Sequence, residues 1–129
     1  MPLTYRIDAG RNLVLTTGTG VLTDEDVLAH KRALIEDPAF VTGMRELSDV
    51  RAVEELRVTP DGVRLMVGLD EKHARARAGC KLAIVAGQPL IFGMARMYQQ
   101  SAEPSVSDVG VFKDHTQALA WLGLDPIEA

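Results

Sequence analysis

Hydrophobic positions along the chain follow two spacings, one typical of β-strands and one typical of amphipathic helices. Alternating or continuous apolar runs predict five strands, at residues 4–9, 13–17, 44–50, 81–86 and 106–112. Stripes that recur every three to four residues, or every seven, predict four helices, which begin after Thr23, Thr59, Gln88 and Asp114. The stretch 51–58 fits neither spacing, and we expect a loop with a short turn there.

Capping residues mark the starts of the predicted helices. Thr23 and Thr59 are favourable N-cap residues, and Pro60 follows at a position where its missing N–H costs nothing. Asp114 stands three residues before Gln117, which is the spacing of a capping box. These signals support the helix boundaries independently of the hydrophobic stripes.

The predicted elements follow the order β-β-α-β-α-β-α-β-α. Strands that alternate with helices need crossover connections, which produce a largely parallel sheet with helices on its faces. The first two strands are joined by a short turn at 10–12 and should run antiparallel. The run 82–86 is apolar on both faces, as expected for an interior strand. We therefore predict a single α/β domain over residues 1–129, with a five-stranded mixed sheet, mostly parallel, and four flanking helices.

Composition agrees with a globular chain and excludes several other classes. The 129 residues are 47% hydrophobic and 25% charged, close to the average for soluble domains. Disordered chains, collagen-like chains and cysteine-rich scaffolds are excluded. No apolar stretch is long enough to cross a membrane, and the N-terminus lacks the pattern of a secretory signal. We expect a soluble, cytoplasmic protein.

Charge argues against a nucleic-acid partner. Fourteen Lys and Arg residues oppose eighteen Asp and Glu residues, for a net charge of −4, whereas a nucleic-acid binder neutralises phosphates with a basic face. The densest basic stretch, 64–81, falls at the end of the second predicted helix. We expect this helix to end near Arg77, because Gly79 is a helix stop signal. Cations at that end complement the helix dipole.

The residues capable of chemistry form no recognisable catalytic or metal-binding pattern. Cys80 is the only cysteine, and because it precedes an apolar run we expect a half-buried structural thiol. His30, His73 and His115 lie far apart without the spacing of metal ligands, and we expect each at the surface. No Gly-x-Ser-x-Gly turn is present. We therefore predict no catalytic residues, no metal and no cofactor, and a protein that is not an enzyme.

Three parts of the chain resemble the SpoIIAA-like (STAS/CRAL-TRIO-like) family of small bacterial proteins. They are residues 58–64, residues 82–86 with 92–98, and residues 111–114 with 118–122. The resemblance implies the α/β fold predicted above. STAS relatives act as phosphorylation-switched antagonists in sigma-factor regulation, so the resemblance also implies a regulatory role.

The STAS switch is a Ser or Thr at the start of the helix that follows the third strand. Thr59 matches this position best, and Ser48 matches it more loosely. Because Pro60 follows Thr59, we expect the threonine hydroxyl to serve as an ordinary helix cap. Thr59 is therefore a candidate phosphoacceptor that we do not expect to be used.

The carboxyl edge of the sheet, where open α/β sheets bind ligands, offers a weak candidate site. Gln88 is a poor helix cap and leaves the first N–H groups of the third helix to a ligand or to water. Asp49 approaches the same edge and could orient a ligand or cap the following loop. Met94 is one of several methionines that could line an adaptable pocket or fill the core.

Two functions follow from these observations as alternatives. The first is a non-enzymatic regulatory or protein-interaction domain, with a protein partner or as a homodimer, whose candidate interface residues are Phe92, Tyr98 and Trp121. The alternative is a module that binds a small apolar molecule or lipid near Asp49, Gln88 and the methionines. A filled interior with an exposed apolar patch would favour the first. An apolar cavity with convergent polar groups would favour the second.

Overall fold

One twisted, mixed sheet forms the centre of the fold, in a computed structural model that describes residues 2–125. The strands lie in the order β1-β2-β3-β4-β5. Their bounds are Leu3–Asp8, Leu13–Thr23, Arg45–Arg57, Cys80–Val85 and Ser107–Phe112. β1 is antiparallel to β2, and the other neighbouring pairs are parallel. The predicted five-stranded, mostly parallel sheet is confirmed, as is the interior place of β4.

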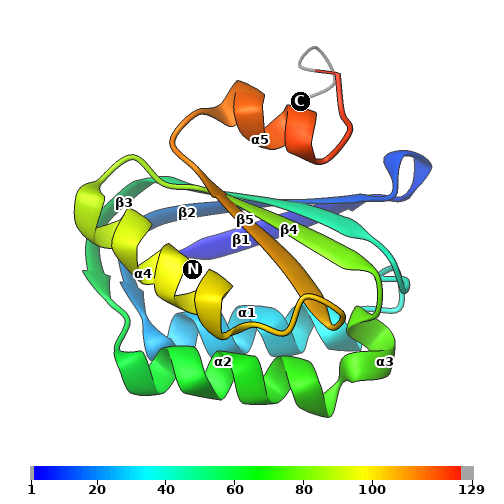
Figure 1. The fold of residues 1–129 in the computed structure, drawn as a ribbon, viewed down its shortest axis with the longest axis horizontal. Coiled ribbons are helices and arrows are strands. Elements are labelled where there is room, and N and C mark those ends of the chain that lie inside the picture. The colour runs from blue at the N-terminus through cyan, green and yellow to red at the C-terminus, as the bar shows by residue number, and fades with distance from the viewer. Residues whose placement is uncertain (1, 126–129) are drawn as a thin grey trace.

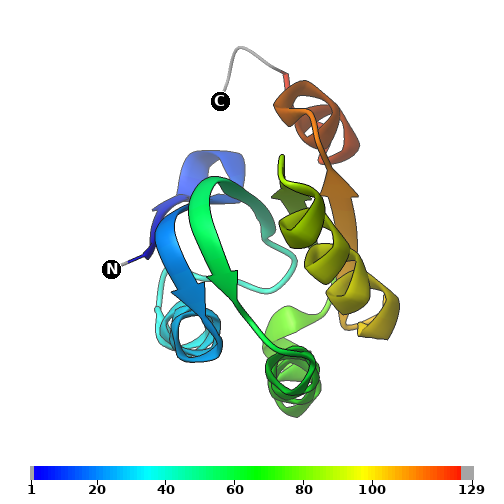
Figure 2. The same cartoon turned by 90° about the vertical axis from the view of Figure 1, so that its left-hand side faces the viewer.

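Helices cover the two faces of this sheet unequally (Figure 1, Figure 2). The bounds of α1 to α5 are Asp24–Glu36, Pro60–Lys72, Ala74–Arg77, Pro89–Ser101 and His115–Trp121. α1, α2 and α4 lie against one face, and α5 lies on the opposite face. The second predicted helix is divided, because His73 leaves the helical conformation at φ −109° and ψ 34° and α3 follows it.

Hydrophobic side chains from the sheet form a core on each face. On the face of α1, α2 and α4, Leu22, Val53 and Val109 are buried against these helices. On the face of α5, Leu47 and Ala83 are buried against that helix. The alternation of side chains along each strand therefore divides the apolar residues between two separate layers.

The stretch that we expected to be a loop, 51–58, is mostly strand. β3 continues to Arg57 and pairs with β2 as far as Thr23, whereas its pairing with β4 ends at Asp49. Beyond that point β2 and β3 form a two-stranded ribbon that bends toward the starts of α1 and α2 (Figure 1). Register shifts in β2 near Gly20, which has φ +64°, accompany this bend. The loop prediction was wrong because charged residues face outward on this ribbon and hide the strand alternation.

The predicted caps position the helices that begin at this bend. Thr23 and Asp26 form a reciprocal capping box at the start of α1. The Thr59 hydroxyl accepts a hydrogen bond from the Gly62 N–H at 3.0 Å at the start of α2. It also donates to Oδ2 of Asp24 at 2.6 Å, which ties the two helix starts together. The threonine caps predicted from the sequence are therefore confirmed.

Candidate functional site

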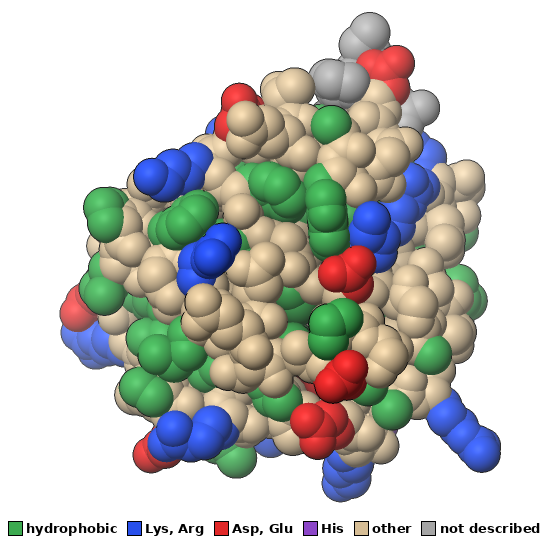
Figure 3. All heavy atoms as spheres, in the orientation of Figure 1, with side chains coloured by type: hydrophobic (Ala, Val, Ile, Leu, Met, Phe, Trp, Pro, Cys, Tyr) green, Lys and Arg blue, Asp and Glu red, His purple; other side chains and the backbone are tan. Residues whose placement is uncertain are grey.

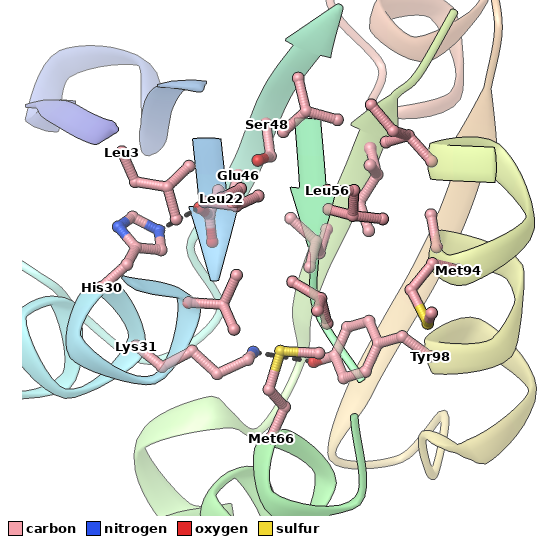
Figure 4. A pocket seen from close by; sticks show the side chains of 17 residues that line it. Leu3, Leu22, His30, Lys31, Glu46, Ser48, Leu56, Met66, Met94 and Tyr98 are labelled. Atoms are coloured by element: carbon pink, nitrogen blue, oxygen red, sulfur yellow. Dashed lines mark hydrogen bonds and ion pairs between the residues drawn. The ribbon is translucent and has the colours of Figure 1, made fainter. Parts of the chain in front are cut away.

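A pocket of about 120 Å³ lies between the sheet and the helices α1, α2 and α4 (Figure 4). Most of the side chains that line it are apolar, and they come from both ends of the domain. Leu22 and Leu56 reach it from the bent ribbon, and Met66 and Met94 reach it from α2 and α4. The bend of β2 and β3 thus closes one end of a cavity that a flat sheet would leave open.

Five polar side chains also reach this pocket. They come from α1, β3 and α4, and they are His30, Lys31, Glu46, Ser48 and Tyr98. Buried polar groups are costly unless they are hydrogen-bonded. Their partners therefore determine which of them remain available to a ligand.

Glu46 is held in its ionised form at the edge of the pocket. Its Oε2 atom accepts a hydrogen bond from the Thr16 hydroxyl at 2.7 Å and lies 3.0 Å from Nε2 of His30. Burial raises the pKa of Glu46, but the hydrogen bond and charge of His30, with the charge of Arg77 and the Thr16 hydrogen bond, lower it to about 2. A carboxylate can only accept hydrogen bonds, so the proton between the two side chains belongs to Nε2 of His30.

Lys31 and Tyr98 belong to a second buried cluster, which is centred on Asp70. Nζ of Lys31 lies 3.1 Å from Oδ1 of Asp70 and donates to the Tyr98 hydroxyl at 2.8 Å. That hydroxyl in turn donates to Oδ2 of Asp70. Arg77 also contacts Asp70, with Nε 3.5 Å from Oδ1, and its Nη2 donates to the Ser107 hydroxyl at 3.2 Å. Both Asp70 and Arg77 are only 2% exposed.

The two cations of this second cluster, Lys31 and Arg77, keep their charges in spite of burial. Burial lowers the pKa of Lys31 and of Arg77, but their interactions with the cluster, that with Asp70 among them, leave both values above the ordinary ones. Burial raises the pKa of Tyr98, so its hydroxyl keeps its proton. Lys31 and Arg77 therefore share the side chain of Asp70, while His30 faces Glu46.

The three weak ligand candidates do not form one site. Asp49 lies on the α5 face, where it lines a separate polar hollow and its carboxylate accepts from Nε of Arg51 at 2.9 Å. Gln88 donates from Nε2 to the Val53 carbonyl at 3.0 Å, which anchors the start of α4 to the ribbon. Met94 does line the pocket. The expectation of a shared site was wrong because Asp49 and Met94 lie on opposite faces of the sheet.

The three candidate interface residues also differ in their surroundings. Tyr98 is 3% exposed and bonded within the core, so it is not available for a surface contact. Phe92 is half-buried beneath the Lys113 ammonium group. Trp121 is half-buried against Phe112, with a distance of 5.6 Å between their ring centroids. Of the three, Phe92 and Trp121 therefore remain partly exposed, and Tyr98 is buried.

His30 was expected at the surface, and this prediction was wrong. The side chain of His30 is 11% exposed and paired with Glu46. Cys80 was expected to be a structural thiol, and its Sγ lies 3.9 Å from the Ala76 carbonyl while burial raises the pKa of the thiol. Arg77 was interpreted as a helix-end cation, but it is buried and faces Asp70.

A signal for the buried charges is present in the sequence. Lys31 lies between Val27 and Leu34 at the spacing of the apolar stripe of α1. Asp70 follows Met66 at the same spacing on α2. A charged residue at an inward-facing position of an amphipathic helix indicates a buried partner. The two positions therefore indicate two buried charges, although the spacing does not show that these two side chains pair.

Comparison with known proteins identifies the fold. No protein-family profile matches the chain, and no curated protein matches it significantly. Among solved structures, it is similar to an uncharacterized protein from the DUF3478 family, with a SpoIIAA-like fold, from Shewanella loihica PV-4. The two share 18% sequence identity over 93% of each chain, with a TM-score of 0.60. The chain therefore has a SpoIIAA-like fold, and the resemblance seen in its sequence is confirmed at this level.

Two further observations concern the described residues. In the range 2–125, no helix combines the length and the hydrophobicity needed to cross a bilayer. Over the same range, no three His, Cys, Asp or Glu side chains are grouped so that they could hold a metal ion.

Proposed function

We propose that this domain binds a small, mostly apolar molecule in the pocket between the sheet and the helices α1, α2 and α4. The observation that carries the proposal is an apolar cavity of about 120 Å³ on which five polar side chains converge. Small-molecule sites are typically concave and mostly apolar, with a few polar groups that fix the orientation of the ligand. The sequence suggested this function as the alternative. Of the residues named for it there, Met94 lines the pocket, whereas Asp49 and Gln88 do not.

The size of the cavity limits the ligand. An apolar cavity of about 150 Å³ engineered into another protein binds benzene. A cavity of about 120 Å³ therefore suits one aromatic ring or a short alkyl chain. A long-chain lipid would need the helices to move apart.

The arrangement favours binding over chemistry. Nucleophilic catalysis needs a nucleophile within hydrogen-bond reach of a base. Nε2 of His30 is occupied by Glu46, and Cys80 contacts a backbone carbonyl rather than a histidine. We therefore include in the proposal that the domain is not an enzyme.

The proposal is tested by filling the pocket. Ala95 lines it from α4, and Ala95→Met would place a longer side chain in the cavity. Ala120→Met is the matched control, because Ala120 is exposed on α5. We expect fluorobenzene to bind the native chain and the control, as measured by 19F NMR, and to bind Ala95→Met at least about tenfold more weakly. Absence of binding to the native chain, or equal binding to both variants, would contradict the proposal.

A second candidate is the regulatory or interaction role, and the outer surface of α4 supports it. Leu90 and Met97 are 66% and 37% exposed, and Met94 stands between them at helical spacing. Hydrophobic side chains are visible on this side of the molecule in Figure 3. We propose a second copy of the chain as the partner, since hydrophobic side chains at a symmetric contact can cover one another.

The test of this second candidate is the oligomeric state. Leu90→Lys should convert a dimer to a monomer in sedimentation velocity experiments. Leu65→Lys is the matched control, because Leu65 is 59% exposed on α2, away from the α4 stripe. A native chain that stays monomeric at every concentration would exclude the homodimer.

A further inference from the structure

The hydrogen-bonding capacity left open in the pocket indicates what kind of ligand it accepts. Both known contacts of the Glu46 carboxylate, from Thr16 and His30, use the same oxygen, Oε2. The other oxygen, Oε1, has no hydrogen-bond partner among the described residues. Oε1 is nevertheless not buried. Among the described residues, Arg77 Nε is the one buried side-chain N or O atom that has no hydrogen-bond partner, so Oε1 of Glu46, which also has none, must be accessible. Glu46 therefore has one accessible carboxylate oxygen that can accept a hydrogen bond.

Ser48 provides a second open group beside it. It lies two residues after Glu46 on β3, so both side chains point to the same face of the sheet, about 6.6 Å apart along the strand. Figure 4 shows Ser48 and Glu46 among the side chains that line the pocket. Among the described residues the Ser48 hydroxyl has no hydrogen-bond partner, and it also is not sealed off. A hydroxyl can both donate and accept a hydrogen bond.

The cationic groups of the site are, in contrast, fully engaged. The Lys31 ammonium group contacts both oxygens of Asp70 and the Tyr98 hydroxyl, which accounts for its three N–H groups. The Tyr98 hydroxyl donates its own proton to Asp70. Neither side chain has a free donor for an anionic ligand. Lys31 and Arg77 both face Asp70, and His30 faces Glu46.

Resting on the binding function proposed above, we propose that the pocket selects an uncharged molecule with a hydroxyl group, such as a small phenol or alcohol. Its hydroxyl donates to Oε1 of Glu46 and accepts a hydrogen bond from Ser48, while its apolar body lies among Leu22, Leu56 and Met94. A carboxylic acid is disfavoured because its carboxylate would lie beside that of Glu46, while the N–H groups of Lys31 and the hydroxyl of Tyr98 are already donated to other partners.

A matched series of fluorinated probes tests this selectivity by 19F NMR near pH 7. We expect 4-fluorophenol to bind about ten- to one-hundredfold more tightly than fluorobenzene, which is the usual effect of a hydrogen bond to a charged group. We expect 4-fluorobenzoate to bind most weakly. Equal affinity for fluorobenzene and 4-fluorophenol, or tighter binding of the benzoate, would overturn the hydroxyl preference and leave the binding function standing. No binding of any probe would overturn both.

Two variants locate the preference at the proposed atoms. Ser48→Ala should reduce the advantage of 4-fluorophenol over fluorobenzene severalfold, whereas Ser105→Ala, at an exposed serine outside the pocket, should leave it unchanged. Glu46→Gln should remove the discrimination against 4-fluorobenzoate. If Glu46→Gln fails to fold, Ser48→Ala decides the matter: an unchanged phenol preference there would refute the assignment.

Discussion

The two faces of the sheet belong to the same five strands, but they are packed differently. On the α5 face, Leu13, Ala83 and Leu119 are at most 1% exposed, and the charged side chains there, Lys81 and Arg45, donate to carbonyls at the end of α5. Its packing is tight, because a Cβ atom on Gly110 would lie 2.7 Å from the Phe112 ring. On the opposite face, three helices leave a pocket and bury two clusters of charged side chains. The first face therefore contributes packing, and the second combines packing with groups able to recognise a ligand.

The buried ion pairs lie on the face of the sheet that α1, α2 and α4 cover. A single short helix can follow the sheet closely, since small residues such as Ala83 and Gly110 let it approach. On the opposite face α1 and α2 start from the bent ribbon and α4 follows β4, and long polar side chains lie between these three helices and the sheet. Lys31 and Asp70 meet there from α1 and α2.

The largest expected effect comes from breaking the charge cluster on the helical face. Asp70→Asn leaves Lys31 and Arg77 buried without their shared carboxylate, which should lower the free energy of unfolding by about 3–5 kcal/mol. Urea denaturation measures this directly. Asp61→Asn is the control, because Asp61 pairs with Arg64 at the surface, where an ion pair contributes at most about 1 kcal/mol. Equal effects of the two substitutions would contradict the buried ion pairs.

The next effect contrasts the packing of the two faces. Leu119→Ala on the α5 face should lower the free energy of unfolding by about 2–5 kcal/mol, because it opens a cavity in tightly packed surroundings. Met94→Ala should cost only about 1 kcal/mol, since the side chain is half-buried and borders an existing space. Thermal or urea unfolding of both variants provides the comparison. A larger loss for Met94→Ala would mean that the pocket is filled in solution.

The smallest of the three effects is a dependence on pH that belongs to the helical face. The pKa of Glu46 falls from its ordinary value of 4.5 to about 2 on folding. Its stabilisation is therefore fully present above pH 4.5 and is lost as the pH falls from there toward 2. The loss should approach about 3 kcal/mol at the acid end.

Denaturation curves recorded between pH 6 and 2 would measure this dependence. Glu46→Gln should flatten the acid part of the stability profile, and Glu25→Gln, at an exposed glutamate of α1, should not. A profile for Glu46→Gln as steep as that of the native chain would show that other carboxyl groups cause the acid destabilisation.

Much of the architecture follows from local patterns. The alternating and continuous apolar runs predicted all five strands, and Thr23, Thr59 and Asp114 marked three helix starts that the structure confirms. These features depend on residues within one turn or one strand. The continuation of β3 to Arg57 was missed because charged residues face outward there, where β3 pairs, among the described residues, with β2 alone. A strand that depends on one distant partner leaves a weak local pattern.

The candidate site could be predicted only in fragments. Met94 was identified, but its polar neighbours were not, and Asp49 was assigned to the wrong face. Lys31 and Asp70 are 39 residues apart, and Lys31 and Tyr98 are 67 apart. Spacing within one helix shows that a charge faces inward, but it does not show which charge it meets.

The sequence by itself determined which segments form most of the strands and helices, where most helices begin, and that crossover connections make the sheet largely parallel. Those properties arise from hydrophobic periodicity and capping, which act between near neighbours in the chain. The tertiary structure alone decided that the ribbon bends toward the helices, that a cavity remains beside it, and that one oxygen of Glu46 has no hydrogen-bond partner within residues 2–125. Such features depend on how layers pack in space, because burial and electrostatic pairing are set by distance between atoms rather than by separation along the chain.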